Sequence, residues 1–361
     1  MTVTLLVQDG DAEAVTFTVS PLAELGAALH VLAEPGHHGG LLAWADRVRA
    51  AMGADLLAEH DSLVFLWRSY RANFLLPMKP GRVLDLEQEL DEIDDMSVEA
   101  FVDEAVQPLR GGGPQHRVVS VLEDQAARER VRTYARSRGA AVEAAVEDLF
   151  ADPQGFRFRL RELLEGCWER FFGDEWAQLR PTLVADAQER SDLARTHGVY
   201  SMFDALAPGV LPDPDAHRVV IDKVHHGKID VARDGLQLVP SVFGWPHVLV
   251  RDGPEWPPSL QYPVRGARRP AARMRTVEKR LEALADPARL RICRSIVREG
   301  RSTQELSEIW GMTPPTVSRH LKVLREAGLV TTQRQGHFVL YRLDLDAAAR
   351  LGPDLLEALL R

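Results

Sequence analysis

The stretch from Gly311 to Val330, GMTPPTVSRHLKVLREAGLV, constrains the fold of this chain more than any other part of the sequence. Pro314 and Pro315 exclude a helix interior, but they suit the first turn of a helix, where the missing N–H does no harm and the fixed φ is favourable. Thr313 stands directly before them, in the position of an N-cap. This arrangement predicts a helix over residues 313–327.

The predicted helix has one apolar and one polar face. Val317, Leu321 and Leu324 recur at spacings of four and three residues, which places them together as a buried stripe. Gly328 follows, where a residue with positive φ commonly ends a helix. The opposite side carries small polar and basic residues, which suit the major groove of DNA. These candidate DNA contacts are Thr313, Pro315, Thr316, Ser318, Arg319, His320 and Lys322.

Three helices are expected ahead of this one. Apolar residues at helical spacing predict the first over Met274–Leu284. Asp286 is the N-cap of the second, which begins at a proline. Ser302 and Glu305 stand at capping-box spacing and start a third, which stops at Gly311, so a tight turn separates it from the next helix. The inner face of the second helix is expected to hold Leu290, Cys293 and Val297.

A β-hairpin is expected after the helices, from the sequence LVTTQRQGHFVLYRL at residues 329–343. Two strand-like runs flank a glycine, as in a hairpin with a tight turn. The tip is basic and can lie along a minor groove or a phosphate ridge. Its candidate DNA contacts are Arg334, Gln335 and His337.

The segments LADPARLRICRSI, STQELSEIWGMTPPTVSRHLKVLREAGLV and VLYRL, in this order and at this spacing, resemble the winged helix-turn-helix of the ArsR/SmtB family of bacterial transcriptional regulators. The resemblance covers roughly Arg273 to Leu343. It implies that 313–327 is the recognition helix and that 331–342 is the wing. It further implies a homodimer, formed through residues 273–284 and 344–360, that binds double-stranded DNA. A repressor on a partly palindromic operator is the implied function.

The metal sites of that family are missing from the matching positions. Metal-sensing members carry Cys-x-Cys before Asp-Leu in the third helix, but this chain has Ser302 and Gln304 there. Other members bind zinc through Asp and His on the last helix, whereas no histidine follows His337. We therefore expect neither a metal nor another cofactor.

Charge is divided unevenly along the chain, whose net charge is −9. Residues 266–361 contain 18 Lys and Arg against 11 Asp and Glu, whereas residues 1–265 contain 26 against 42. A basic module on an acidic body suits a domain that binds a polyanion such as DNA. Residues 252–271, with five prolines and two glycines, are expected to be an irregular connector between the two domains.

The acidic domain, residues 1–265, is expected to be α+β, mainly helical with a small β-sheet. Strand-like runs at Val3–Val7 and Val15–Val19 flank QDGDAE, which predicts a hairpin. Ser20 and the proline after it predict the start of a helix of roughly a dozen residues. Helical patterns dominate residues 41–195.

From Arg218 onward the sequence pattern changes from helical to short strand-like runs. These runs predict one small mixed or antiparallel sheet joined by the N-terminal hairpin. The segments SPLAELGAALHVL, RPTLVADAQER and LVPSVFGWP resemble an uncharacterised domain that precedes ArsR-type winged helices in some longer regulators. That second resemblance implies no known activity.

Clustered histidines in the acidic domain, which can bind zinc or nickel, are the first feature that invites a functional reading. His30, His37 and His38 lie near one another, and His225 and His226 form a pair. We interpret them as exposed loop histidines, because they stand beside glycines and no carboxylate or cysteine is at ligand spacing.

Two further features are interpreted as structural. The run CWERFFGDEW, with Trp168, Phe171, Phe172 and Trp176, is interpreted as helix core rather than as an organic-ligand pocket. RGGGP at 110–114 lacks the residues of a phosphate loop and is interpreted as a turn.

Two functional hypotheses remain. The first is a transcriptional regulator whose N-terminal domain senses a ligand or partner, or supports assembly; the second is an enzyme or ligand-binding domain fused to a DNA-binding tail. No G-x-S-x-G, H-E-x-x-H or nucleotide-binding motif occurs, so we expect no enzyme. A small organic effector or a protein partner is expected between the helix around Trp168 and the region of Phe243 and Trp245, with little effect of metal ions.

The expected compartment is the cytoplasm, with no membrane partner. Asp9, Asp11 and Glu13 stand where a signal peptide would need an apolar core. No apolar run approaches the roughly 20 residues of a membrane span.

Overall fold

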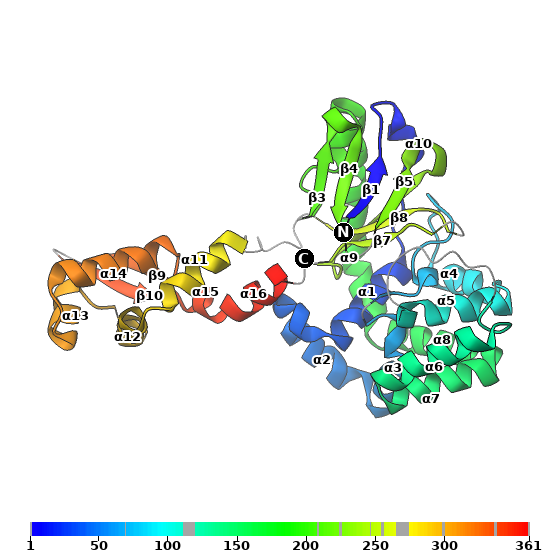
Figure 1. Cartoon of the computed structure of the whole chain (residues 1–361), viewed down its shortest axis with the longest axis horizontal. Helices are drawn as coiled ribbons and strands as arrows, with labels where there is room; N and C mark the ends of the chain where they lie inside the picture. The colour runs from blue at the N-terminus through cyan, green and yellow to red at the C-terminus, as the bar shows by residue number, and fades with distance from the viewer. Residues whose placement is uncertain are drawn as a thin grey trace. The chain divides into compact units, whose positions relative to one another are not determined.

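The computed structural model divides into two compact units, residues 1–269 and 270–360 (Figure 1). It describes residues 2–68, 70–110, 120–207, 209–223, 226–245, 247–253, 256–264, 274–297, 300–335 and 338–359. Several predicted features lie outside these residues: the turn at 111–114, His225, His337, residues 265–271 of the connector, and the side chains of His37 and Gln335.

The N-terminal unit is built around the helix α1, Pro21–Ala33. As predicted, Ser20 caps it, because its Oγ accepts a hydrogen bond from the Ala23 N–H at 2.9 Å. Every residue from Pro21 to Leu32 is buried, so α1 is a central helix rather than a surface one. The apolar core forms between it and the surrounding helices.

The surrounding helices confirm the mainly helical prediction for this part of the chain. They are α2 Leu42–Met52, α3 Ala54–Ser62, α4 Leu86–Asp94, α5 Val98–Arg110, α6 Gln125–Arg138, α7 Ala140–Ala151, α8 Pro153–Cys167 and α9 Gly173–His197. A π-helical turn, Trp168–Phe172, joins α8 to α9.

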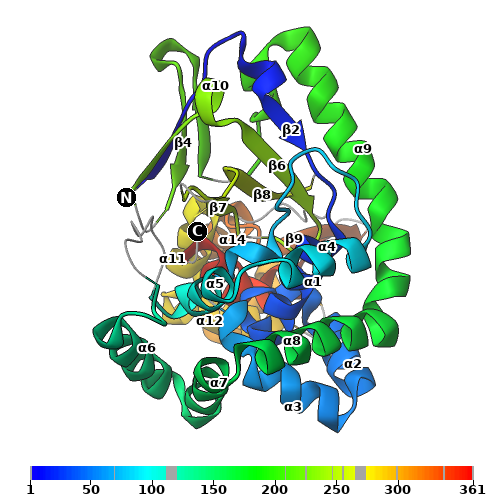
Figure 2. The same cartoon turned by 90° about the vertical axis from the view of Figure 1, so that its right-hand side faces the viewer.

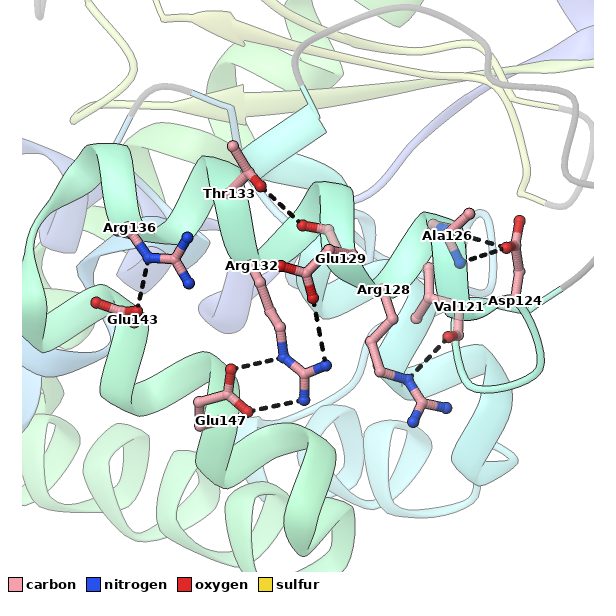
Figure 3. Close-up of polar contacts among 11 residues, drawn as sticks. Val121, Asp124, Ala126, Arg128, Glu129, Arg132, Thr133, Arg136, Glu143 and Glu147 are labelled. Atoms are coloured by element: carbon pink, nitrogen blue, oxygen red, sulfur yellow. Dashed lines mark hydrogen bonds and ion pairs between the residues drawn. The ribbon is translucent and has the colours of Figure 1, made fainter.

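Arginine–glutamate pairs join α6 to α7 on the surface of this unit (Figure 3). Arg132 donates to both carboxylate oxygens of Glu147 at 2.7 and 2.9 Å, and Arg136 donates to Glu143 at 3.0 Å. These side chains are all at least partly exposed to solvent, so each pair stabilises the fold by about 1 kcal/mol at most.

In the described part of this unit, the strands form two four-stranded sheets, in the orders β3-β4-β1-β5 and β2-β6-β8-β7 (Figure 2). The first contains β1 Thr2–Leu6, β3 Val210–Asp213, β4 Arg218–Asp222 and β5 Gly227–Asp230. The second contains β2 Val15–Phe17, β6 Leu236–Ser241, β7 Leu249–Arg251 and β8 Ser259–Pro263. The short helix α10, Val231–Asp234, lies between β5 and β6 in the chain.

The predicted N-terminal hairpin is wrong, as is the prediction of a single sheet. β1 pairs antiparallel with β4 and parallel with β5, whereas β2 pairs parallel with β6. A 3-10 turn at Asp11–Ala14 separates the two strands and leads the chain from one sheet to the other. Each strand therefore finds its partners more than 200 residues away, where a local pattern gives no information.

The predicted irregular connector is wrong over residues 259–263. Strand β8 lies between β6 and β7 and is buried throughout. Pro257 and Pro258 precede the strand and Pro263 is its last residue, so the run from Ser259 to Tyr262 keeps its N–H groups for the sheet. A short gap between prolines is sufficient for an interior strand.

A buried polar trio ties β8 to α9, which runs alongside this sheet (Figure 2). The Tyr262 hydroxyl donates to Asp186 Oδ2 at 2.8 Å, and Arg190 Nε donates to the same oxygen at 3.0 Å. Burial raises the pKa of Tyr262 well above its usual value. The tyrosine therefore stays a neutral donor.

The C-terminal unit is the predicted helical module with a β-hairpin. Its elements are α11 Met274–Leu284, α12 Pro287–Ile296, α13 Thr303–Trp310, α14 Pro314–Glu326, β9 Val330–Gln335, β10 Phe338–Leu343, α15 Leu345–Ala349 and α16 Leu351–Leu359. Asp286 caps α12 as predicted, accepting from the N–H groups of Ala288 and Arg289. The α+β fold class with a C-terminal winged helix-turn-helix is thus confirmed.

One predicted helix face is rotated. Leu290 is 50% exposed, whereas Ile292, Cys293 and Ile296 are buried on α12. Successive residues turn by about 100°, so Leu290 lies more than a quarter-turn from the centre of this buried face. The inner face therefore contains Cys293, as predicted, but not Leu290.

Among the described residues, no helix combines the length and the apolar character that a membrane crossing requires.

Candidate nucleic-acid interface

The helix-turn-helix begins with a complete capping box on α13. Ser302 Oγ accepts from the Glu305 N–H at 3.3 Å, while the Ser302 N–H donates to Glu305 Oε2 at 2.6 Å. Gly311, with φ of 60°, ends the helix, and the Met312 N–H donates back to the Ser307 carbonyl at 3.1 Å. Residues 311–313 form the whole connection between the end of α13 and the start of α14.

The start of α14 differs from the prediction in one respect. Thr313 is the N-cap residue, but its side chain makes no capping hydrogen bond. An N-cap side chain normally accepts from the second or third N–H of the helix, and the second position here is Pro315, which has none. Instead, Thr313 Oγ1 lies 2.9 Å from Thr316 Oγ1.

The predicted buried stripe of α14 is confirmed. Val317, Leu321 and Leu324 are fully buried and pack in one cluster with residues of α12 and α13, including Ile292 and Leu306. This packing fixes the rotation of α14 about its axis. The opposite face therefore points away from the core.

Most candidate contacts on α14 lie on that open face. Pro315, Ser318, Arg319 and Lys322 are exposed, and Thr316 is half-buried. Arg319 Nη2 donates a long hydrogen bond of 3.4 Å to Thr316 Oγ1. Within the described part of the chain, Arg319 makes no ion pair. Lys322 has an i,i+4 contact of 3.8 Å with Glu326, and both side chains are well solvated.

His320 lies apart from the other candidates. Its side chain is only 19% exposed, and its Nδ1 is 4.0 Å from Asp286 Oδ2 at the start of α12. The pKa of Asp286 is lowered, mainly because the carboxylate accepts backbone N–H bonds, with a smaller contribution from His320. His320 therefore faces the neighbouring helix.

Arg325 is a basic residue on this helix that the sequence reasoning did not single out. It is exposed in the last turn of α14. Arg319, Lys322 and Arg325 follow one another at three-residue spacing, so the exposed basic side chains run obliquely from the open face of the helix to its flank. The same spacing was visible in the sequence.

The hairpin after α14 is antiparallel, and Gln335 pairs with Phe338. Arg334 is exposed next to its tip. A third segment joins the hairpin: the Arg301 N–H donates to the Tyr341 carbonyl at 3.0 Å, and the Tyr341 N–H donates back at 2.8 Å. This single-residue bridge has no sequence signature, and it ties the hairpin to the start of α13.

The flanking helices α11 and α16 are in contact and share a buried ion pair. Arg280 Nη1 lies 2.8 Å from Asp354 Oδ2, and both side chains are largely covered. Three leucines nevertheless remain exposed on these two helices: Leu281, Leu356 and Leu359. The pair of helices thus presents apolar side chains to its surroundings.

The histidines of the N-terminal unit are not all where the sequence reasoning expected them. His226 is exposed, as expected, but His30 and His38 are buried. His30 belongs to the last turn of the central helix α1. His38 lies between two short 3-10 turns that fold it back against the core. For these two residues the interpretation as exposed loop histidines is wrong.

The aromatic run after α8 is helix core, as interpreted. Phe172 is buried, and Trp168, Phe171 and Trp176 pack against the same cluster. In the region where an effector was expected, the Phe243 ring packs 6.1 Å from that of Phe172 and 4.5 Å from that of Trp44, centroid to centroid.

An open groove of about 760 Å³ lies elsewhere in this unit. Trp176, Arg180 and Val184 of α9 form one wall, and Phe17 and Gln88 contribute to the other. Its lining is mostly apolar with a few polar groups, as in many ligand sites.

Comparison with known proteins divides the chain in the same way. Residues 1–268 match the model of a family of unknown function, DUF5937, and residues 284–333 match that of a helix-turn-helix domain. The N-terminal match covers well over half of the chain.

The curated relatives match the C-terminal part alone. The HTH-type transcriptional repressor SmtB of Mycobacterium tuberculosis is 42% identical over 82 residues, which is 20% of this chain and 61% of that protein. A biofilm growth-associated repressor of Agrobacterium fabrum is 44% identical over 71 residues, again 20% and 61%. The corresponding repressor of Xylella fastidiosa is 38% identical over 79 residues, 22% and 69%. The chain thus spans about three fifths of the length of the first relatives it matches.

Two solved structures are similar over the same part. A possible transcriptional regulator for arsenical resistance is 36% identical, with a TM-score of 0.20, over 20% of this chain and 76% of that one. The homodimeric winged helix-turn-helix DNA-binding domain of a possible ArsR-family regulator from Mycobacterium bovis is 29% identical, with a TM-score of 0.21, over 24% and 80%. The chain belongs to the family of unknown function DUF5937, and it joins that domain to a C-terminal winged helix-turn-helix of the ArsR/SmtB type.

Proposed function

We propose that the protein is a cytoplasmic transcriptional regulator that binds double-stranded DNA through α14 and the wing. The observation that carries this proposal is the open face of α14, where Arg319, Lys322 and Arg325 are exposed on a helix whose rotation is fixed by its buried stripe. A basic face on the second helix of a helix-turn-helix fits the major groove. The relatives named as repressors favour repression over activation.

The contacts differ in their proposed roles. Arg319 reads a base edge, because a guanidinium can contact guanine with two donors. Thr313, Pro315, Thr316 and Ser318 lie near the start of α14, the part of a recognition helix that contacts base edges. Lys322 and Arg325 neutralise phosphates further along the helix. Of the wing residues, Arg334, Gln335 and His337 are proposed to contact the adjacent groove or backbone. His320 is the least favoured candidate, because it faces Asp286.

Dimerisation is proposed to involve α11 and α16. Their exposed leucines, Leu281, Leu356 and Leu359, offer apolar surface at the two flanking helices, and exposed apolar surface is often an interface. A two-fold dimer would bind two half-sites about one DNA turn apart, or a multiple of it. The operator is therefore proposed to be partly palindromic.

The experiment that tests this function is selection of bound fragments from a pool of bacterial genomic DNA, followed by footprinting. We expect enrichment of one partly palindromic sequence with two protected half-sites. Recovery of fragments without a shared sequence, or failure to retain DNA at moderate salt, would contradict the proposal.

A second candidate function concerns the N-terminal unit and is favoured by the groove beside α9. A mostly apolar groove with a few polar groups suits a small organic molecule, either as an effector or as the substrate of an enzymatic domain. A protein partner on this unit is the other possibility for control. Native mass spectrometry of the purified protein and a turnover screen separate these alternatives, since an effector is bound unchanged whereas a substrate is consumed.

A further inference from the structure

Three histidine rings from distant parts of the sequence meet inside the N-terminal unit. One ring nitrogen of each of His30, His38 and His247 lies within 4.8 Å of the other two. The ring centroids are 5.1, 5.2 and 5.4 Å apart, and the ring planes are steeply inclined, at 84°, 75° and 75°. His30 and His38 are buried and His247 is partly buried. The rings therefore converge by their edges on one small volume.

Backbone carbonyls fix the tautomers of two of these rings. His30 Nδ1 lies 3.0 Å from the Trp67 carbonyl oxygen, and His38 Nδ1 lies 2.6 Å from the Trp245 carbonyl oxygen. A carbonyl can only accept, so each Nδ1 carries the proton, and Nε2 of the neutral ring carries the lone pair. This is the outer-shell arrangement that orients histidine ligands in metal sites.

Tight turns hold the backbones of His38 and His247 in place. The His38 N–H donates to the Pro35 carbonyl at 3.0 Å, and the His38 carbonyl accepts from the Leu41 N–H at 2.7 Å. The His247 N–H donates to the Gly244 carbonyl at 2.7 Å. His30 is carried by the central helix. The cluster is therefore organised before any ligand arrives.

The surroundings of His30 favour its neutral form. The pKa of His30 is well below its usual value, chiefly because of burial and then because of Arg71, His38 and His247. Neutral imidazole, rather than imidazolium, donates a lone pair to a metal. The positive charge of Arg71 opposes a bound cation, and the Glu24 carboxyl group, whose own pKa is raised by burial, interacts electrostatically with Arg71.

A purely hydrogen-bonded cluster explains the geometry less well. With the Nδ1 protons of His30 and His38 directed to carbonyls, His247 is the one ring of the three that can donate toward the other two. A cation at the centre, in contrast, accepts a lone pair from each ring at once.

We propose that His30, His38 and His247 form a binding site for a first-row transition-metal ion, of which Zn²⁺ fits best. Imidazole ligands suit Zn²⁺, Ni²⁺ and Cu²⁺, and zinc takes three protein nitrogens with a fourth position open to water or another ligand. Zinc–nitrogen bonds of about 2.0–2.1 Å in a tetrahedron separate the nitrogens by roughly 3.4 Å. Metal binding would therefore draw the three nitrogens, which lie within 4.8 Å of one another, closer together.

This site replaces the expectation that the chain has no metal. His30 has His37 and His38 as its neighbours in the sequence, but no further ligand follows at short spacing. The third ligand, His247, follows β6 and is more than 200 residues away. The proposed site is independent of DNA binding, so either proposal can fail without the other.

The test uses tag-free, full-length protein stripped with a chelator and then titrated with Zn²⁺ or Co²⁺. We expect one metal ion per chain by native mass spectrometry, and visible absorption bands of a nitrogen-ligated, four-coordinate Co²⁺. His38→Asn keeps a donor for the Trp245 carbonyl but removes Nε2. This variant should bind at least about tenfold more weakly. His197→Gln, which removes an exposed histidine at the end of α9, should bind like wild type.

Absence of binding at equimolar metal, or equal affinity of His38→Asn and wild type, would overturn the proposal. If His38→Asn does not fold, as judged by circular dichroism, X-ray absorption at the zinc edge of the wild-type protein decides the question. Scattering from three imidazoles supports the site, whereas fewer than three overturns it.

Discussion

Replacing Arg319 with alanine is the sharpest test of the proposed groove face. Arg319 is exposed, and its hydrogen bond to Thr316 is long, at 3.4 Å, so its removal should leave the fold intact. If the guanidinium reads guanine, the loss should be about 1 to 3 kcal/mol at one or two base positions. With RT near 0.6 kcal/mol, Kd for the operator should rise by roughly 5- to 150-fold. Kd for unrelated DNA should change far less, so discrimination is lost.

Lys322→Ala should behave differently, because an ammonium group acts on phosphates as a point charge. Its one ion pair among the described residues, 3.8 Å from Glu326, is solvated and contributes little to the fold. The plot of log K against log salt has a negative slope. Loss of one phosphate contact should make this slope shallower by about 0.9. Between 50 and 200 mM salt, wild-type affinity should therefore fall about 3.5-fold more than that of the variant. Specific and unrelated DNA should be affected alike.

The assay is fluorescence anisotropy with the selected operator, single-base variants of it and unrelated DNA, at several salt concentrations. Arg136→Ala is the matched control, because it removes the same kind of side chain from the exposed face of α6 in the N-terminal unit (Figure 3). The control should bind like wild type. If Arg319→Ala and Lys322→Ala also bind like wild type at every salt concentration, the assignment of the groove face is wrong.

Three further outcomes follow from the structure. Leu356→Glu, which places a charge on the exposed apolar surface of α16, should convert the proposed dimer to monomer by light scattering, and a wild-type protein that is monomeric both free and on DNA would contradict this reasoning. Leu321→Ala removes a fully buried side chain from the stripe of α14 and should lower the free energy of unfolding of the C-terminal unit by about 2 to 5 kcal/mol in urea titrations. Glu89 accepts a hydrogen bond from the Leu22 N–H at 2.8 Å, and burial raises the pKa of Glu89 to about 8. Between about pH 4.5 and 8, the unfolded chain has therefore lost a proton that the folded chain keeps on Glu89. Wild type should therefore lose stability as pH rises through this window, by at most about 1.4 kcal/mol per unit, whereas Glu89→Gln should not, and parallel curves for the two proteins would refute this account.

Most helices and strands of the C-terminal unit could be predicted from the sequence, because they depend on patterns among residues close together in the chain. A capping box joins residues three apart, a proline in the first turn acts on its own position, and a buried stripe repeats every three or four residues. These rules placed α13, the turn at Gly311, α14 and its open face correctly. They did not place Leu290 correctly, because the rotation of α12 depends on which neighbours cover it, and they did not reveal the bridge between Arg301 and Tyr341.

In the N-terminal unit the sequence determined that helices dominate and that Ser20 caps α1, but only the tertiary structure decided how the strands pair and which residues meet. A strand carries an alternating pattern but no record of its partner, and here β1 and β2, close in sequence, joined different sheets through strands more than 200 residues away. The same long-range pairing made an interior strand of β8 between prolines. It also carried His247, at the end of the turn that follows β6, to the buried rings of His30 and His38. Burial and proximity arise from the packing of distant segments, so neither the burial of these histidines nor their third partner could be derived from spacing along the chain.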